Sequence, residues 1–226
     1  MKPIALGFDF DHTLGMDHKL ERTAFVQLMQ ETEIAAGRTL AIAQASEIID
    51  RQIAFYRAGR CSLSHAFEQA FEAIAGRIAP IGAFEEFRER AVGLVKERVT
   101  PVPGAEQLLA QLDALAMPYA ILTNGWNPLQ QRKADAIGFS QPVFVSDDIG
   151  VRKPSIHAFN VLRDYFDRAP EHIWYVGDDP LNDVVGALGA GMRAIWFDGE
   201  QQKYPTTMPA PTAIVKNISD ILSLIV

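Results

Sequence analysis

The sequence has few of the residues that build disulfides, membrane spans or nucleic-acid surfaces. Cys61 is the only cysteine, so neither an internal disulfide nor a CxxC zinc site can form. No stretch approaches the roughly 18 consecutive apolar residues of a membrane-spanning helix. The N-terminal apolar run turns acidic at Asp9, too early for a signal peptide. We therefore expect a cytoplasmic protein with no membrane partner.

Basic residues are also in the minority. Lys and Arg number 21 against 28 Asp and Glu, which gives a formal net charge of -7. Because a nucleic-acid partner usually requires a basic face, this balance argues against one. With 226 residues, 48% of them hydrophobic, the chain is long enough for one large domain or two small ones. The sequence leaves the oligomeric state open.

Short, continuous apolar runs indicate a parallel β-sheet. Strands that are buried on both faces have this continuous pattern, whereas half-exposed strands alternate. Helical patterns lie between several of the runs, and strands that alternate with helices predict an α/β fold with a doubly wound, Rossmann-like parallel sheet. The predicted strands cover residues 4–10, 119–123, 143–146 and 173–177, with a weaker one at 194–198.

The region between about residues 20 and 99 interrupts this alternation. It contains no convincing strand, but its apolar residues recur at helical spacing in four stretches. We expect four amphipathic helices that are inserted after the first strand and that return through the Pro-rich segment 100–104. The predicted catalytic core therefore comprises residues 1–16 and 100–226. Residues 17–99 are predicted to form an all-helical cap domain.

Two carboxylates follow the first predicted strand. Asp9 and Asp11 are two residues apart on an extended segment, so their side chains point the same way and their repulsion requires a cation or a shared proton. Mg²⁺ would supply that charge. Taken alone, the pair is more simply explained as an ordinary acidic turn at the end of a strand.

Polar residues close three further predicted strands. Each set alone has a structural explanation as a turn, a surface dipeptide or a helix cap. Because ligands of such sheets bind at the carboxyl ends of the strands, their joint occurrence predicts one site with a nucleophile, an acid or base, cation ligands and phosphate donors. The residues are Thr123 and Asn124 after the second strand, Lys153 after the third, and Asp178, Asp179 and Asp183 after the fourth.

In this order the residues resemble the four motifs of the haloacid dehalogenase superfamily. The resemblance covers nearly the whole chain, and the helical insert resembles the family's C1 cap. Dehalogenases of the family lack an Asp two positions after the nucleophile, whereas its phosphatases and phosphomutases carry one. The matching positions are Asp9, Asp11 and Thr13 in the first motif, Thr123 in the second, Lys153 in the third, and Gly177, Asp178 and Asp183 in the fourth; His12 and Asp179 depart from the common residues.

The resemblance implies a Mg²⁺-dependent phosphatase that hydrolyses a small phosphomonoester through an aspartyl-phosphate. Asp9 would be the nucleophile, and Asp11 would protonate the leaving group and then activate water. The implied Mg²⁺ ligands are the Asp9 carboxylate, the Asp11 backbone carbonyl and Asp178, with Asp183 and Asp179 as outer partners of the metal; the implied phosphate-binding residues are Thr123, Asn124 and Lys153.

Several functions remain open at this point. The segments after Thr123 and around Lys153 resemble the nucleotidase and sialic-acid-9-phosphatase branch, and a nucleotide or sugar phosphate is the favoured substrate. Phosphoglycolate also remains open. A phosphomutase would use the same residues but would form an isomer instead of free phosphate. A non-catalytic regulatory binding module would show no Mg²⁺-dependent turnover on any phosphate.

Overall fold

The chain divides into two compact units. A computed structural model describes residues 4–225, so residues 1–3 and 226, the ends of the predicted core, lie outside the described residues. The first unit contains the described residues up to Asp17 together with those from Val99 onward. The second unit is His18–Arg98. The first unit is therefore discontinuous in sequence.

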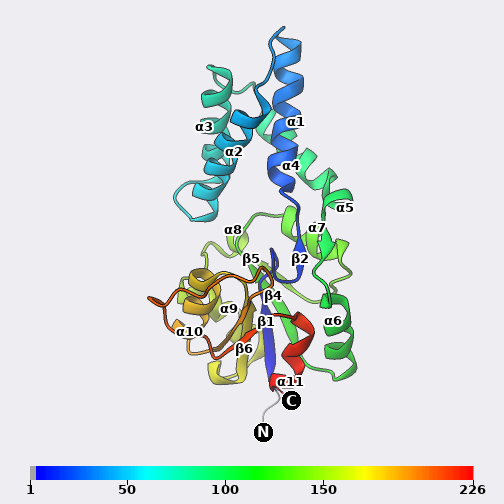
Figure 1. The fold of residues 1–226 in the computed structure, drawn as a ribbon, viewed down its shortest axis with the longest axis vertical. Helices are drawn as coiled ribbons and strands as arrows, with labels where there is room; N and C mark the ends of the chain where they lie inside the picture. Colours follow the sequence, from blue (N-terminus) through cyan, green and yellow to red (C-terminus); the bar gives the residue numbers. More distant parts are fainter. Residues whose placement is uncertain (1–3, 226) are drawn as a thin grey trace. The chain divides into compact units, whose positions relative to one another are not determined.

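A six-stranded sheet, parallel throughout, forms the centre of the first unit (Figure 1). Its order is β5-β4-β1-β6-β7-β8, so β1 lies between β4 and β6, and Leu6 pairs with both Tyr119 and Trp174. This arrangement confirms the predicted α/β fold with a doubly wound parallel sheet. The strands are β1 (Ala5–Phe8), β4 (Tyr119–Thr123), β5 (Val143–Val145), β6 (Ile173–Gly177), β7 (Arg193–Phe197) and β8 (Ala213–Val215).

Helices cover both faces of this sheet (Figure 1). One face packs against α9 and α10, and the core there contains Phe159, Leu162 and Tyr175. The opposite face is covered by α6 and α11. The helices are α6 (Ala105–Ala114), α7 (Leu129–Ala136), α8 (Ser146–Ile149), α9 (Ile156–Phe166), α10 (Gly186–Gly189) and α11 (Ile221–Ile225), with 3₁₀ turns at Pro170–His172 and Ile218–Asp220 and a π-helical segment, η2, at Pro180–Val185.

Two very short strands mark where the chain leaves and re-enters the first unit. β2 (Gly15–Met16) pairs antiparallel with β3 (Thr100–Pro101), so the segment predicted as a linker begins with a strand. Gly15 is required at this point, because a Cβ there would lie 2.5 Å from the ring of Phe10. After β2 the chain passes through His18 and Lys19, which have φ values of 46° and 60°.

The second unit is helical, and each of the four predicted amphipathic stretches forms a helix. Its core is aromatic: the Phe25 ring stacks on Phe67 with centroids 4.6 Å apart, and Phe87 lies 5.3 Å from Phe25. The helices are α1 (Leu20–Ala35), α2 (Ile42–Arg57), α3 (Leu63–Ala75), α4 (Ala83–Gly93) and α5 (Val95–Arg98).

Ion pairs add to this core. Glu33 is only 5% exposed and accepts hydrogen bonds from Arg38 at 2.6 Å and from Arg77 at 3.0 Å.

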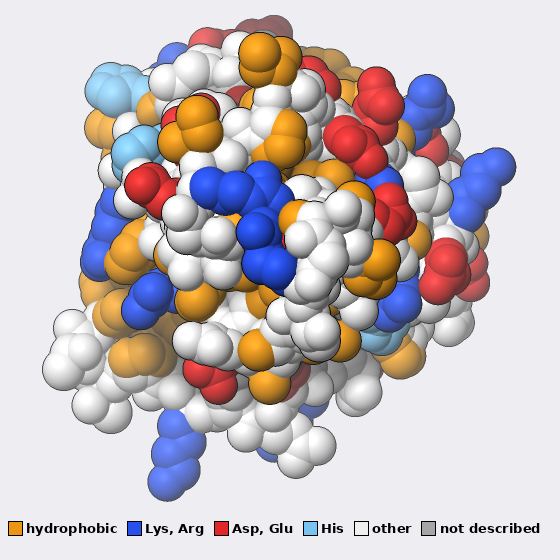
Figure 2. Space-filling model, turned by 90° about the horizontal axis from the view of Figure 1, so that it is seen from above, with side chains coloured by type: hydrophobic (Ala, Val, Ile, Leu, Met, Phe, Trp, Pro, Cys, Tyr) orange, Lys and Arg blue, Asp and Glu red, His pale blue; other side chains and the backbone are white. Residues whose placement is uncertain are grey.

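Figure 2 shows basic side chains interspersed with acidic and apolar ones on the face that it displays. Among residues 4–225, no helix combines the length and the apolar character needed to cross a bilayer.

Candidate active site

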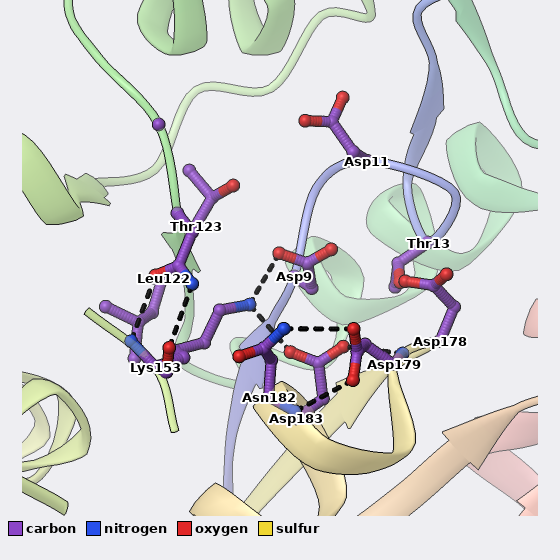
Figure 3. A network of polar contacts seen from close by, with 12 residues as sticks. Asp9, Asp11, Thr13, Leu122, Thr123, Lys153, Asp178, Asp179, Asn182 and Asp183 are labelled. Carbon is purple, nitrogen blue, oxygen red and sulfur yellow. Dashed lines mark hydrogen bonds and ion pairs between the residues drawn. The ribbon is translucent and has the colours of Figure 1, made fainter. Parts of the chain in front are cut away.

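Asp9 lies at the carboxyl end of the central strand. Its backbone N–H donates to the Val176 carbonyl of β6 at 2.8 Å, which continues the pairing one residue beyond β1. The side chain is buried, and its Oδ1 accepts a hydrogen bond from Lys153 Nζ at 2.6 Å (Figure 3). Burial raises the pKa of Asp9, although the Lys153 ammonium opposes that shift. The lysine therefore favours the charged form of this carboxylate.

Lys153 is held by three oxygen atoms. Besides Asp9, its Nζ donates to Asp183 Oδ1 at 2.7 Å and to the Tyr175 hydroxyl at 2.8 Å. Burial lowers the pKa of Lys153, but Asp183 and Asp9 outweigh that effect and hold it well above its usual range. Tyr175 donates in turn to the Leu122 carbonyl at 2.6 Å. Lys153 is thus a fixed positive charge beside Asp9.

Tyr175 was not among the predicted site residues. It stands in the middle of β6, whereas the sequence pattern directs attention to strand ends. A buried tyrosine usually finds a hydrogen-bond partner for its hydroxyl, and that requirement was the available signal. In the structure the partner is the lysine that faces Asp9.

Three carboxylates converge beside this lysine. Each of Asp9, Asp178 and Asp183 offers an oxygen, and these three atoms lie within 4.8 Å of one another. Burial, with repulsion from Asp183 and Asp9, raises the pKa of Asp178 to about 9. Burial also raises the pKa of Asp183 to about 7, although Lys153 opposes the shift. One lysine does not balance three carboxylates, and an all-oxygen donor set of this kind suits a hard divalent cation such as Mg²⁺.

Asp183 lies in the η2 segment, and hydrogen bonds fix the position of its carboxylate. The Asp183 Oδ2 accepts from the backbone N–H of Asp179 at 2.9 Å, while the Asp183 Oδ1 accepts from Lys153. The Asp179 carboxylate caps the segment by accepting from the backbone N–H groups of Leu181 and Asn182, each at 2.8 Å. Asp179 therefore acts as a helix cap in this structure, and its side chain is directed to the backbone that carries Asp183.

Two hydrogen bonds hold Asp178 in place, one to its side chain and one to its backbone. Thr13 Oγ1 donates to Asp178 Oδ1 at 3.4 Å, and the indole N–H of Trp196 donates to the Asp178 carbonyl at 2.7 Å. The first and fourth predicted motifs are thus in direct contact. The strand order explains this contact, because β1 and β6 are neighbours and both end at the same edge of the sheet.

The residues after β4 connect the site to its surroundings. Thr123 is 1% exposed, and its hydroxyl accepts from Gln130 Nε2 at 3.3 Å. The Asn124 side chain exchanges two hydrogen bonds with the Lys153 backbone: Nδ2 donates to the carbonyl at 3.0 Å, and Oδ1 accepts from the N–H at 2.9 Å. Gly125 donates its N–H to Ser146 Oγ at 3.0 Å. These side chains therefore tie the Thr123 turn to the Lys153 loop.

The structure separates the Asp11 carboxylate from this cluster. Figure 3 shows it directed away from Asp9. Its Oδ1 accepts from Lys133 Nζ at 2.5 Å, and its Oδ2 accepts from Gln130 Nε2 at 3.1 Å. Neither donor was predicted as a site residue. Helical spacing was the one sequence feature that could have identified these two donors, because both lie on the buried face of α7 that also carries Leu129.

The chain resembles known proteins over most of its length. A sequence model described as haloacid dehalogenase-like hydrolase matches residues 5–191. The phosphoserine phosphatase of Thermus thermophilus is 29% identical over 228 residues, covering 89% of this chain and 91% of that protein. The pyrimidine 5′-nucleotidase YjjG of Escherichia coli is 27% identical over 159 residues, covering 64% of this chain and 70% of that protein.

Solved structures share the fold. The putative HAD-hydrolase YfnB of Bacillus subtilis, solved with magnesium bound, superposes with a TM-score of 0.76 at 21% identity and covers 100% of this chain and 99% of its own. A 2-haloacid dehalogenase from Pseudomonas syringae superposes with a TM-score of 0.70 at 22% identity and covers 98% and 97%. The fold is therefore shared by a putative hydrolase and by a dehalogenase. Since the family's sequence model matches most of the chain and includes Asp9, Thr123, Lys153 and Asp178, the chain belongs to the haloacid dehalogenase-like hydrolases.

Proposed function

We propose that this protein is a Mg²⁺-dependent phosphatase that hydrolyses a small phosphomonoester through an aspartyl-phosphate on Asp9. The observation that carries the proposal is the buried Asp9 carboxylate, paired with Lys153 at 2.6 Å and followed two residues later by Asp11. Known relatives that are phosphatases support it. Asp11 argues against the dehalogenase alternative, because the dehalogenases that this sequence resembles lack that residue.

In the first step, an Asp9 oxygen attacks the substrate phosphorus. The new P–O bond forms as the bond from phosphorus to the alcohol oxygen breaks, and Asp11 gives its proton to that departing oxygen. Two anions approach each other in this step. The Lys153 ammonium and the Thr123 hydroxyl would offset part of the charge on the phosphoryl group.

In the second step, water attacks the phosphorus of the aspartyl-phosphate. Asp11, now ionised, takes a proton from that water. The bond between phosphorus and the Asp9 oxygen breaks, which releases inorganic phosphate and restores both carboxyl groups. A single residue thus serves first as acid and then as base.

The oxygen cluster fits the cation that this chemistry requires. Asp9, Asp178 and the backbone carbonyl of Asp11 would hold Mg²⁺, with Asp183 and Asp179 behind them. When bound, Mg²⁺ supplies positive charge that lowers the repulsion between the carboxylate and the phosphate. The raised pKa values of Asp178 and Asp183 support this assignment, because burial and repulsion from neighbouring carboxylates disfavour their charged forms, which a bound cation would stabilise.

We favour a nucleotide or a sugar phosphate as the substrate. Phosphatases of small metabolites recur among the relatives, including a glyceraldehyde 3-phosphate phosphatase of Pyrococcus furiosus that is 34% identical over 100 residues, or 42% of this chain and 41% of that protein. The helical region, residues 17–99, is proposed to act as a cap that selects substrate and excludes water. Thr123, Asn124 and Lys153 are proposed to bind the phosphate.

A panel of phosphomonoesters tests the proposal. Phosphate release is measured with Mg²⁺ and with EDTA on nucleotides, sugar phosphates, phosphoserine and phosphoglycolate. Asp9→Asn should keep the fold but lose turnover, because an amide is a poor nucleophile. Retention of more than about a tenth of the wild-type kcat by this variant would exclude covalent catalysis at Asp9. Isomer formation without phosphate release would indicate a phosphomutase instead.

A further inference from the structure

Two side chains of α7 occupy both oxygens of Asp11. Lys133 Nζ lies 2.5 Å from Oδ1, and Gln130 Nε2 lies 3.1 Å from Oδ2. The residues are three apart on one helix, so they project from the same face. The carboxylate therefore has its position and its rotation fixed by a single rigid element.

The lysine is too well buried for this to be an incidental surface contact. Lys133 is 1% exposed, and its Nζ also donates to Asp17 at 3.1 Å and lies 5.7 Å from the centroid of the Phe10 ring. A buried ammonium is costly unless it is paired. Here two carboxylates pair with it, and one of them is Asp11.

The turn after β4 has a glycine, Gly125, at the point where the Gln130 side chain packs against it. Gln130 is 4% exposed and lies over Gly125, where a Cβ would come within 2.6 Å of Nε2. The same amide nitrogen lies 3.3 Å from Thr123 Oγ1 and 3.2 Å from the Asn124 carbonyl. Its partner atom Oε1 is buried without a hydrogen bond among the described residues. One amide thus connects Asp11 to the turn that carries Thr123.

The direction in which Asp11 is held matches the requirement of the reaction. In an in-line displacement, the leaving oxygen departs on the side of phosphorus opposite to the nucleophile. An acid for that oxygen must therefore stand away from Asp9. Figure 3 shows the Asp11 carboxylate facing away from Asp9. The donors that hold it in this direction both come from α7.

We propose that Lys133 and Gln130 are positioning residues that hold the Asp11 carboxylate on the leaving-group side of the phosphoryl group. This inference rests on the proposed phosphatase function. Lys133 fixes one oxygen of the acid and Gln130 fixes the other. Asp17 accepts a second hydrogen bond from Lys133. Asp17 is the last residue of the first unit before the chain enters the helical unit.

Kinetics on two kinds of leaving group test the assignment. A sugar or nucleoside alkoxide needs a proton to depart, whereas p-nitrophenolate leaves without one. Because a misplacement of about 1 Å can cost roughly 10²-fold in rate, Lys133→Met should lose about that factor in kcat on the alkyl phosphate. Gln130→Met, which keeps the charge balance, should lose about tenfold, since one of the two donors remains. The burst-phase rate on p-nitrophenyl phosphate should change far less in both variants.

Arg132→Met is the matched control. It removes one positive charge from the neighbouring position of α7, but Arg132 is 63% exposed and pairs only loosely with Asp135 at 3.7 Å. Turnover of this variant should equal that of the wild type on both substrates. A loss equal to that of Lys133→Met would show that general charge, not position, is responsible, and would overturn the inference.

Stability and a double variant separate positioning from damage to the fold. Lys133→Met combined with Asp11→Asn should lose no more alkyl turnover than Asp11→Asn alone, because the lysine acts through that carboxylate. Additive losses, or equal losses on alkyl and aryl substrates in Gln130→Met with an unchanged melting temperature, would overturn the inference while leaving the proposed function intact. An inactive wild-type enzyme would instead remove the proposed function and this inference with it.

Discussion

Asp9 and Asp11 are two residues apart, yet their carboxylates have different surroundings. Asp9 is buried against Lys153 and the other carboxylates, whereas the Asp11 side chain is 17% exposed and is held by α7. Different environments give neighbouring carboxylates different roles in many hydrolases. The separation supports one nucleophile and one acid or base, not a pair that shares a proton.

The proposed acid role of Asp11 predicts a defect that depends on the leaving group. Asp11→Asn should lose about 10² to 10⁴ in rate on alkyl phosphates, because the alkoxide no longer receives a proton. On p-nitrophenyl phosphate, the first step should be nearly unchanged and the second slow, so burst-phase kinetics should show accumulated aspartyl-phosphate. Equal loss of the first-step rate on both substrates would mean that Asp11 acts through structure or metal binding.

The acidic cluster predicts a pH-dependent response to Mg²⁺. In the metal-free protein the pKa of Asp178 is about 9, above its value in the unfolded chain, so its protonated form stabilises the fold. That stability is fully present below about pH 4 and is lost as pH rises toward 9. Mg²⁺ bound as proposed would replace the proton, so the increase in melting temperature on adding Mg²⁺ should be larger at pH 8.5 than at pH 5.5.

Asp178→Asn provides the control for this titration. The amide is close in shape to the acid but carries no charge, so the pH dependence of the Mg²⁺ effect should become much weaker. The metal-free variant should also be at least as stable as the metal-free wild type near pH 8, because Asp178 must take up a proton to fold at that pH and the amide need not. An equal Mg²⁺ effect at both pH values in the wild type would contradict the prediction.

At the scale of elements, the close approach of β6 to the η2 segment determines where the Asp183 side chain lies. A Cβ on Gly177, at the end of β6, would lie 2.2 Å from Cγ of Asp183. Gly177→Ala should therefore displace Asp183 from Lys153, destabilise the fold by about 1–3 kcal/mol and lower turnover by about 10²-fold. Thermal unfolding and kcat measure the two effects.

Gly189→Ala, at the end of α10, is the matched control. Its Cβ would lie 3.5 Å from Ile156, which is an ordinary contact distance. Alanine favours a helix over glycine by about 1 kcal/mol, so this variant should be as stable as the wild type or more so. A loss of activity in Gly189→Ala like that in Gly177→Ala would show that any added methyl group in this region is harmful.

The sequence predicted the elements that bury many apolar residues. The five predicted strands all form, and residues 204–211 contain no helix or strand, as expected of a loop with three prolines. It did not predict β2, β3 or β8, which have two or three residues each and exist because a neighbouring strand is there to pair with them. Pairing of this kind leaves little trace in local composition.

The candidate site was predictable at strand ends and not elsewhere. Asp9, Lys153, Asp178 and Asp183 meet because parallel strands bring their carboxyl ends to one edge. The contacts from α7 were not predicted, because a buried lysine on a helix is hard to distinguish from an exposed one in a short polar sequence. Their partners come from segments more than 100 residues away in the chain.

At the scale of the whole molecule, each unit has its own core, so the two are expected to unfold separately. All three tryptophans, Trp126, Trp174 and Trp196, lie in the first unit, whereas far-UV circular dichroism also reports the helices of the second. Glu33→Gln should weaken only the second unit, by roughly 1–2 kcal/mol because its arginine partners are partly exposed. The circular dichroism transition in urea should move and the tryptophan fluorescence transition should not.

Glu33 also makes the stability of the second unit depend on pH. Hydrogen bonding from Arg38 lowers the pKa of Glu33 below its usual value, so its contribution to stability is present above about pH 4.5 and is lost as pH falls through the lowered value. Wild-type and Glu33→Gln proteins should therefore differ at pH 7 and converge near pH 3. Movement of both spectroscopic transitions together would show instead that the chain unfolds as one unit.

The position of β1 at the centre of the sheet has a consequence for synthesis on the ribosome. Leu6 emerges first, but its partners Tyr119 and Trp174 follow more than 100 residues later, after the whole helical unit. At typical elongation rates the nascent strand waits roughly 5–25 s for β4. An apolar segment left unpaired for that long is prone to aggregate unless charges flank it. Asp9 and Asp11 stand directly after this strand, so we expect them to keep the newly made chain soluble well before there is an active site.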